Sequence, residues 1–179
     1  MVKASNKTIG LVGGTFDPAH KGHIAITKIA IKKLKLSKVL WIVTKKNPLK
    51  HNPYYSLAQR LKKAKELTKG IKKIQVIHLD KRVNSSRSIN IINYLVKRKK
   101  LKNIYFIIGA DNLINFHKWK DWKRIVKLTK LIVFSRKGYD RKGRKSIVAR
   151  YLKNKITFIH NKHIIISSTN LRKKARKDN

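Results

Sequence analysis

Short apolar runs alternate along the chain with stretches in which apolar residues recur every three or four positions. The runs are rich in β-branched residues and predict strands over 8–12, 38–44, 74–79, 104–108, 131–134 and 156–159. The stretches between them predict helices over 24–34, 57–67, 89–96 and 169–175, with Ser56 as N-cap of the second. This alternation is typical of a parallel sheet built from βαβ units.

The strands are apolar at successive positions rather than at every second one, as in Ile104-Tyr105-Phe106-Ile107-Ile108. Such strands are buried on both faces, so we predict an α/β fold, a single Rossmann-like doubly wound domain with a mainly parallel sheet. A length of 179 residues suits one such domain, covering 1–179. The charged, glycine-containing segment 137–145 is predicted to be a mobile loop. Ligands of such folds bind at the carboxyl ends of the strands.

The end of the first strand carries the motif with the most chemistry, Gly-Gly-Thr-Phe-Asp-Pro-Ala-His-Lys-Gly-His over 13–23. Two glycines allow a tight turn and let backbone N–H groups approach a phosphate. His20 and His23 lie three residues apart at a helix start, so both imidazoles are expected on one face, positively charged and facing a phosphate. The phosphate-binding residues predicted here are Gly13, Gly14, Thr15, Phe16, Asp17, His20 and His23.

A second motif, Ile-Ser-Ser-Thr-Asn-Leu-Arg over 166–172, stands near the end of the chain. Small hydroxyl residues entering a helix offer hydroxyls and free N–H groups to an anion, and an arginine can clamp a phosphate. Alone, such a segment is usually an N-cap. Paired with the first motif, it predicts phosphate contacts by Ser167, Ser168, Thr169 and Arg172.

These two motifs resemble the T-x-x-H-x-G-H and I-S-S-T-x-x-R signatures of the nucleotidylyltransferase superfamily, in which the second binds ATP. Segments 41–50, 109–122 and 135–139 extend the similarity over nearly the whole chain to the bacterial nicotinate-nucleotide adenylyltransferases. The resemblance implies that Trp119 stacks on a pyridine ring and that Asp111 and Arg136 help hold the nucleotides. Gly109 is expected beside ATP, and Lys50 and Ser88 are expected beside the other substrate.

The resemblance also implies the reaction: the 5′-phosphate of nicotinate mononucleotide attacks the α-phosphorus of ATP, giving deamido-NAD and pyrophosphate. Mg²⁺ is expected as cofactor, held mainly by ATP phosphates. A protein-held metal is not expected, because His20 and His23 lack a third ligand. The segment 85–88 reads Ser-Ser-Arg-Ser where the family usually has a P-S-Y-T-like sequence, so Arg87 replaces an aromatic ring. Arg87 either pairs with the nicotinate carboxylate or points to solvent.

Two other functions remain as alternatives. A pantetheine-phosphate adenylyltransferase would share both ATP motifs, but offers no counterpart to the Trp119–Trp122 pair. A non-enzymatic nucleic-acid-binding protein is suggested by 47 Lys and Arg against 7 Asp and Glu, a formal charge of +40. Lysines occur in every segment and far outnumber arginines, which favours a compositional bias, so we expect no specific nucleic-acid partner.

The remaining features suit a cytoplasmic protein with no membrane partner. No apolar run approaches the roughly twenty residues of a membrane span, and the polar N-terminus is not a signal peptide. The absence of cysteine excludes disulfides, thiolate metal sites and cysteine nucleophiles. The sequence leaves the oligomeric state open.

Overall fold

The structure is a computed structural model that describes residues 7–47, 49, 52–161 and 168–175. Its sheet has the order β3-β2-β1-β4-β5-β6, and all neighbouring strands are parallel. This is the strand order of a dinucleotide-binding Rossmann fold, whose topological switch point lies between β1 and β4. The strands are β1 (Ile9–Gly14), β2 (Lys38–Val43), β3 (Ile74–Ile77), β4 (Ile104–Gly109), β5 (Lys130–Phe134) and β6 (Ile156–Ile159).

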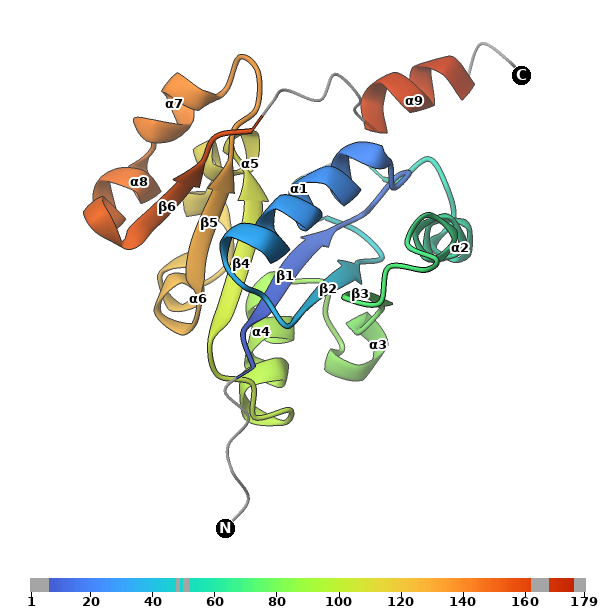
Figure 1. Cartoon of the computed structure of the whole chain (residues 1–179), viewed down its shortest axis with the longest axis horizontal. Helices are drawn as coiled ribbons and strands as arrows, with labels where there is room; N and C mark the ends of the chain where they lie inside the picture. The colour runs from blue at the N-terminus through green and yellow to red at the C-terminus, as the bar shows by residue number, and fades with distance from the viewer. Residues whose placement is uncertain (1–6, 48, 50–51, 162–167, 176–179) are drawn as a thin grey trace.

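Helices cover both faces of the sheet (Figure 1). One face packs against α1 (Lys21–Lys33) and α2 (Leu57–Leu67). The other packs against α4 (Ser88–Lys97), α5 (Ala110–Ile114), α6 (Trp122–Leu128) and α8 (Ile147–Leu152). The remaining helices are α3 (Asp80–Val83), α7 (Asp140–Arg144) and α9 (Ser168–Ala175), with 3₁₀ turns η1 (Phe116–Lys118) and η2 (Lys153–Lys155).

The strands bury side chains on both faces, and this explains their continuous apolar sequences. In β2, Leu40 and Ile42 enter the core beneath α4, whereas Val39, Trp41 and Val43 enter the core beneath α1. Each strand therefore contributes to two hydrophobic cores, as expected for a doubly wound sheet.

The predicted fold class and all six strands are confirmed, and α2 begins and ends where it was predicted to. Ser56 caps α2 through a reciprocal pair of hydrogen bonds with Gln59. The loop predicted over 137–145 is wrong in part, because α7 occupies residues 140–144. This helix packs Gly143 against Ala110 of α5, where a Cβ would lie 3.2 Å from the Ala110 carbonyl oxygen. A tertiary contact of this kind produces no apolar periodicity in the sequence, so α7 could not be predicted from such a pattern.

Candidate active site

A cleft of about 1500 Å³ opens over the carboxyl ends of β1, β4 and β5, at the topological switch point. The loop after β1, the N-terminus of α5, the segment that follows β5 and the start of α9 all contribute to its lining. Most of the predicted ATP-binding residues line it: Gly13, Gly14, Thr15, Phe16, Asp17, His20, His23, Gly109, Asp111, Ser168, Thr169 and Arg172.

His20 and His23 cap the start of α1 with their own rings. The Nδ1 atom of His20 accepts a hydrogen bond from the Gly22 N–H (3.1 Å), and Nδ1 of His23 accepts one from the His20 N–H (3.2 Å). A backbone N–H can only donate, so neither Nδ1 carries a hydrogen. In the neutral rings the hydrogen is therefore on Nε2. Both histidines line the cleft, so each offers one N–H donor to a ligand there.

The positive charge predicted for these two rings is wrong for the free protein. Burial, with a smaller effect of Arg136, lowers the pKa of His20 to about 4. Burial, then the neighbouring His20 and Arg136, lower the pKa of His23 to about 3. The two ring centroids are only 3.9 Å apart, so two imidazolium charges would repel strongly. Near neutral pH the pair acts as neutral hydrogen-bond donors.

Aromatic rings and one buried hydroxyl hold the His23 ring in place. The Phe16 ring lies 4.9 Å from it and stacks on Trp41, with centroids 5.0 Å apart. The indole Nε1 of fully buried Trp41 donates to the Thr27 hydroxyl (2.9 Å), which donates to the His23 carbonyl oxygen (2.7 Å). The backbone and ring of His23 are thus fixed before any substrate arrives.

An ion pair between two predicted nucleotide-binding residues also lines the cleft. Nη1 of Arg136 lies 2.6 Å from Oδ2 of Asp111. The other carboxylate oxygen, Oδ1, is buried and has no hydrogen-bond partner in the described part of the chain. A Cβ on residue 109 would lie 2.5 Å from that oxygen, so Gly109 makes room for the Asp111 side chain. Asp140 accepts from the Arg136 backbone N–H (2.8 Å) and steadies the loop after β5.

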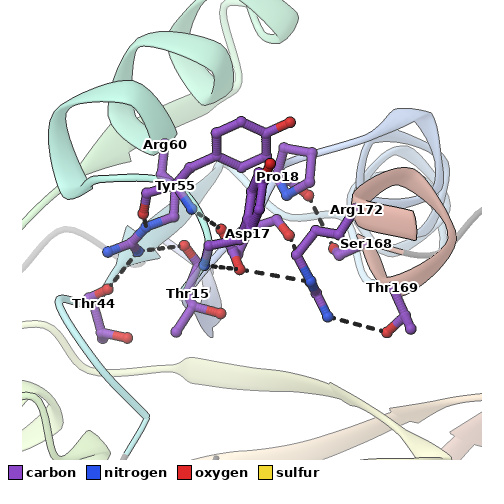
Figure 2. A network of polar contacts seen from close by, with 10 residues as sticks. Thr15, Asp17, Pro18, Thr44, Tyr55, Arg60, Ser168, Thr169 and Arg172 are labelled. Atoms are coloured by element: carbon purple, nitrogen blue, oxygen red, sulfur yellow. Dashed lines mark hydrogen bonds and ion pairs between the residues drawn. The ribbon is translucent and has the colours of Figure 1, made fainter. Parts of the chain in front are cut away.

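The second motif docks directly on the loop after β1 (Figure 2). The Ser168 hydroxyl donates to the Pro18 carbonyl oxygen (2.9 Å), and Nη1 of Arg172 donates to the Asp17 carbonyl oxygen (2.6 Å). Arg172 also donates to the Thr169 hydroxyl (3.3 Å). The two motifs therefore meet at one site.

Asp17 is 6% exposed, and its carboxylate is bonded to the protein itself. Oδ2 accepts from the Tyr54 N–H (2.8 Å), and Oδ1 accepts from the Tyr55 N–H (2.9 Å). The structure therefore places Asp17 as a support for the loop that lines the cleft.

A second cavity of about 320 Å³ adjoins the cleft and is largely apolar. It shares Gly13, Gly14 and Trp119 with the cleft. Predicted Ser88 lines this cavity at the start of α4, together with the cations Arg87, Lys118 and Lys120. Trp119 packs on Phe116 (4.8 Å between centroids) and is only partly buried, whereas Trp122 packs on Tyr151 (5.1 Å) outside both cavities.

The sequence analysis did not identify two buried charged residues, Arg60 and Asp80, which hydrogen-bond to the backbone of loops around the site. Arg60 lies on the apolar face of α2 with Leu57, Leu61 and Ala64, and a charge at such a position was a usable signal. No comparable pattern marks Asp80. Lys50 and Ser167, which were also predicted, lie outside the described residues.

The described residues contain no group of three His, Cys, Asp or Glu side chains that could hold a metal ion. They also contain no helix long and apolar enough to cross a bilayer.

Comparison with known proteins agrees with this geometry. A family model described as cytidylyltransferase-like matches residues 11–174. A "Probable nicotinate-nucleotide adenylyltransferase" of Pelagibacter ubique (strain HTCC1062) is 48% identical, with 97% of this chain and 99% of the relative covered. A protein of the same name from Ruegeria sp. (strain TM1040) is 36% identical, with 80% and 75% covered. The structure of Plasmodium falciparum nicotinic acid mononucleotide adenylyltransferase complexed with NaAD has the same fold (TM-score 0.74, 16% identity, 93% of this chain and 83% of that chain covered).

Proposed function

The chain belongs to the nicotinate-nucleotide adenylyltransferase family, and we propose that it transfers the adenylyl group of ATP to nicotinate mononucleotide, giving deamido-NAD and pyrophosphate. This is the step that makes the dinucleotide precursor of NAD. The cytoplasmic location expected from the sequence stays a prediction.

One observation carries the proposal: two cavities of different chemistry meet at the loop after β1. The large cleft contains both histidines and Arg172, and it suits a triphosphate nucleotide. The smaller apolar cavity is partly walled by Trp119, whose ring suits a flat heterocycle. Gly13, Gly14 and Trp119 line both, so two nucleotides can bring their phosphates together beside the histidines.

In this arrangement the phosphate of the mononucleotide attacks the α-phosphorus of ATP in line, and pyrophosphate leaves from the opposite side. The nucleophile is already an anion, so no general base is needed. The two histidines are neutral and use Nδ1 to cap α1, which suits a role without proton transfer. Their Nε2–H groups donate to oxygens of the α-phosphate and leaving group, where negative charge grows in the transition state. Arg172 adds a positive charge to the cleft lining.

Mg²⁺, when bound, would neutralise charge on the ATP phosphates. Because the described residues offer no cluster of ligands, substrate oxygens would supply most of its coordination. Asp111, which lines the cleft and is paired with Arg136, is the carboxylate that we expect to help hold a ligand there.

The lining of the smaller cavity favours a substrate whose ring carries an acidic substituent. Arg87, Lys118 and Lys120 line it, and no Asp or Glu does so among the described residues. The charged groups that a nicotinate carboxylate would meet there are all cations, and a neutral nicotinamide would gain no ion pair from them.

The decisive experiment measures pyrophosphate release from ATP with nicotinate mononucleotide, nicotinamide mononucleotide or phosphopantetheine as acceptor, and identifies each product by mass. We expect the highest kcat/KM with nicotinate mononucleotide. Faster turnover of phosphopantetheine would establish the pantetheine alternative. No turnover with any acceptor would leave the non-enzymatic alternative.

A further inference from the structure

Arg60 of α2 is buried against the back of the active-site loop and is only 2% exposed. Its guanidinium donates to four backbone carbonyl oxygens and to no carboxylate among the described residues. Figure 2 shows the bonds to Thr15, Thr44 and Tyr55. Nη1 donates to Thr15 (2.6 Å) and Thr44 (2.8 Å). Nη2 donates to Lys45 (3.0 Å), and Nε donates to Tyr55 (3.0 Å).

These carbonyl groups belong to three segments that are distant in sequence. Thr15 is in the loop that lines the ATP cleft, and Thr44 follows β2 and lines the smaller cavity. Tyr55 precedes α2. Arg60 thus links the wall of one cavity to the wall of the other.

The segment after β2 is held from its other side as well. The Thr44 N–H donates to the Gly14 carbonyl oxygen (2.9 Å), and the Lys45 N–H donates to Oδ2 of Asp80 (2.7 Å). Asp80 also accepts from the Ser86 hydroxyl, and Ser86 lines the smaller cavity. The peptide groups at 44 and 45 therefore have fixed donors and fixed acceptors.

Burying a guanidinium costs free energy, because the charged group loses its contact with water. Burial lowers the pKa of Arg60, and the nearby charges of Asp17 and Asp80 oppose that shift. An apolar side chain would pack α2 on the sheet without this desolvation cost. A planar fork of five donors, however, can join four carbonyl groups in one fixed geometry, whereas an apolar group has no donor and a lysine has only three, all on one nitrogen.

Resting on the function proposed above, we propose that Arg60 is a positioning residue that sets the ATP loop against the wall of the mononucleotide cavity. It touches neither substrate; it acts through the carbonyl groups of Thr15, Thr44 and Lys45. In-line attack needs the two reacting atoms in near-contact, and a misplacement of 1 Å can cost about 100-fold in rate.

Arg60→Lys is the informative variant, because it keeps a cation but loses the fork. We expect kcat to fall by about 10- to 100-fold, while KM for each substrate changes far less, since each half-site keeps its own contacts. Arg150→Lys, at an exposed position of α8, is the chemically matched control and should leave kcat unchanged. Leu152→Ala, at the last and buried position of α8 and outside both cavities, controls for lost stability.

Melting temperature, kcat and both KM values should be measured on the same preparations, well below every melting transition. Wild-type kcat in Arg60→Lys, with a lowered melting temperature like that of Leu152→Ala, would overturn the proposal. Chemical rescue supplies a second readout: ethylguanidinium, which matches the arginine side chain beyond Cβ, should raise the kcat of Arg60→Ala, whereas propylammonium, which matches lysine beyond Cβ, should not. Equal effects of both compounds would refute the need for a fork.

Hydrogen exchange separates this inference from the proposed function, because it needs no turnover. Arg60→Lys should speed exchange of the Thr44 amide, which is bonded to Gly14, relative to Arg150→Lys. Unchanged exchange would overturn the positioning role even if the wild-type protein proves to be the expected transferase. A wild-type protein that lacks the activity, with faster exchange in Arg60→Lys, would instead refute the proposed function alone.

Discussion

The His23 ring combines two tasks that different substitutions can separate. Its Nδ1 accepts the His20 N–H and helps cap α1, while its Nε2 carries a hydrogen and remains available to the cleft. Asparagine can place an amide oxygen near the position of Nδ1, and glutamine can place an amide N–H near the position of Nε2. His23→Asn therefore keeps the cap without the donor, and His23→Gln keeps a donor without the cap.

The two losses differ in size and in the quantity they change. Removing one donor to transition-state charge typically costs about 2.7–4 kcal/mol, or about 10²–10³ in kcat. Losing a capping hydrogen bond costs about 1 kcal/mol of stability. For a chain of this length that lowers the melting temperature by roughly 2–4 °C. We expect His23→Asn to melt near wild type with kcat reduced 10²–10³-fold, and His23→Gln to melt lower with more activity retained.

Steady-state kinetics and thermal melts on the same preparations decide the matter, with His23→Ala as the variant that loses both functions. ATP affinity, measured separately by calorimetry, should change only modestly in His23→Asn, because the lost interaction strengthens in the transition state. The reasoning is refuted if His23→Asn keeps wild-type kcat, or if all three variants lose activity only in proportion to lost stability.

Three other predictions follow from the site. Trp119→Ala should raise KM for the mononucleotide about fivefold, near the lower end of stacking energies at ~1 kcal/mol, and leave KM for ATP nearly unchanged; equal increases would assign Trp119 to packing alone. Arg87→Ala should reduce the kcat/KM preference for nicotinate over nicotinamide mononucleotide by about two- to fivefold, the effect of an exposed ion pair, and an unchanged ratio would place Arg87 in solvent. The free energy of unfolding should fall as pH drops from 6.5 towards 4, because His20 and His23 bind protons in the unfolded chain but stay neutral when buried in the folded one. A double variant, His20→Asn with His23→Asn, should show a shallower dependence of stability on pH, and an unchanged slope would contradict the prediction.

Much of the fold could be predicted because its information is local. Six apolar runs became six strands, and Ser56 with the apolar face of α2 defined that helix. The short helices α3, α5, α6, α7 and α8 were missed, since each has only four to seven residues and therefore little room for an apolar period. Gly109 precedes α5 and Tyr139 precedes α7, so neither start carries a capping side chain.

The candidate site likewise has features that could be predicted from the sequence and features that could not. His20 and His23 belong to a compact motif, so their place in the cleft could be predicted from residue type and spacing, whereas Trp119 was placed by the resemblance to a family. The state of the imidazoles could not be predicted, because the low pKa values arise from burial and from Arg136, more than a hundred residues away in sequence. Arg60 donates to the backbone carbonyl oxygen of Thr15, which lies 45 positions away in sequence, so no pattern of side chains predicts this contact.

The distribution of the few acidic residues bears on what the charge of +40 means. Of the seven acids, four support the candidate site: Asp17, Asp80, Asp111 and Asp140. Each accepts a hydrogen bond from a backbone N–H or an arginine there, a task that no lysine can perform. A basic surface shaped to hold nucleic acid would be defined by where its cations are. In this chain the cations are spread over every segment, and the acids that remain are concentrated where the geometry needs an acceptor. That pattern favours a general replacement of acids by lysine on a folded enzyme, and the absence of a specific nucleic-acid partner stays a prediction.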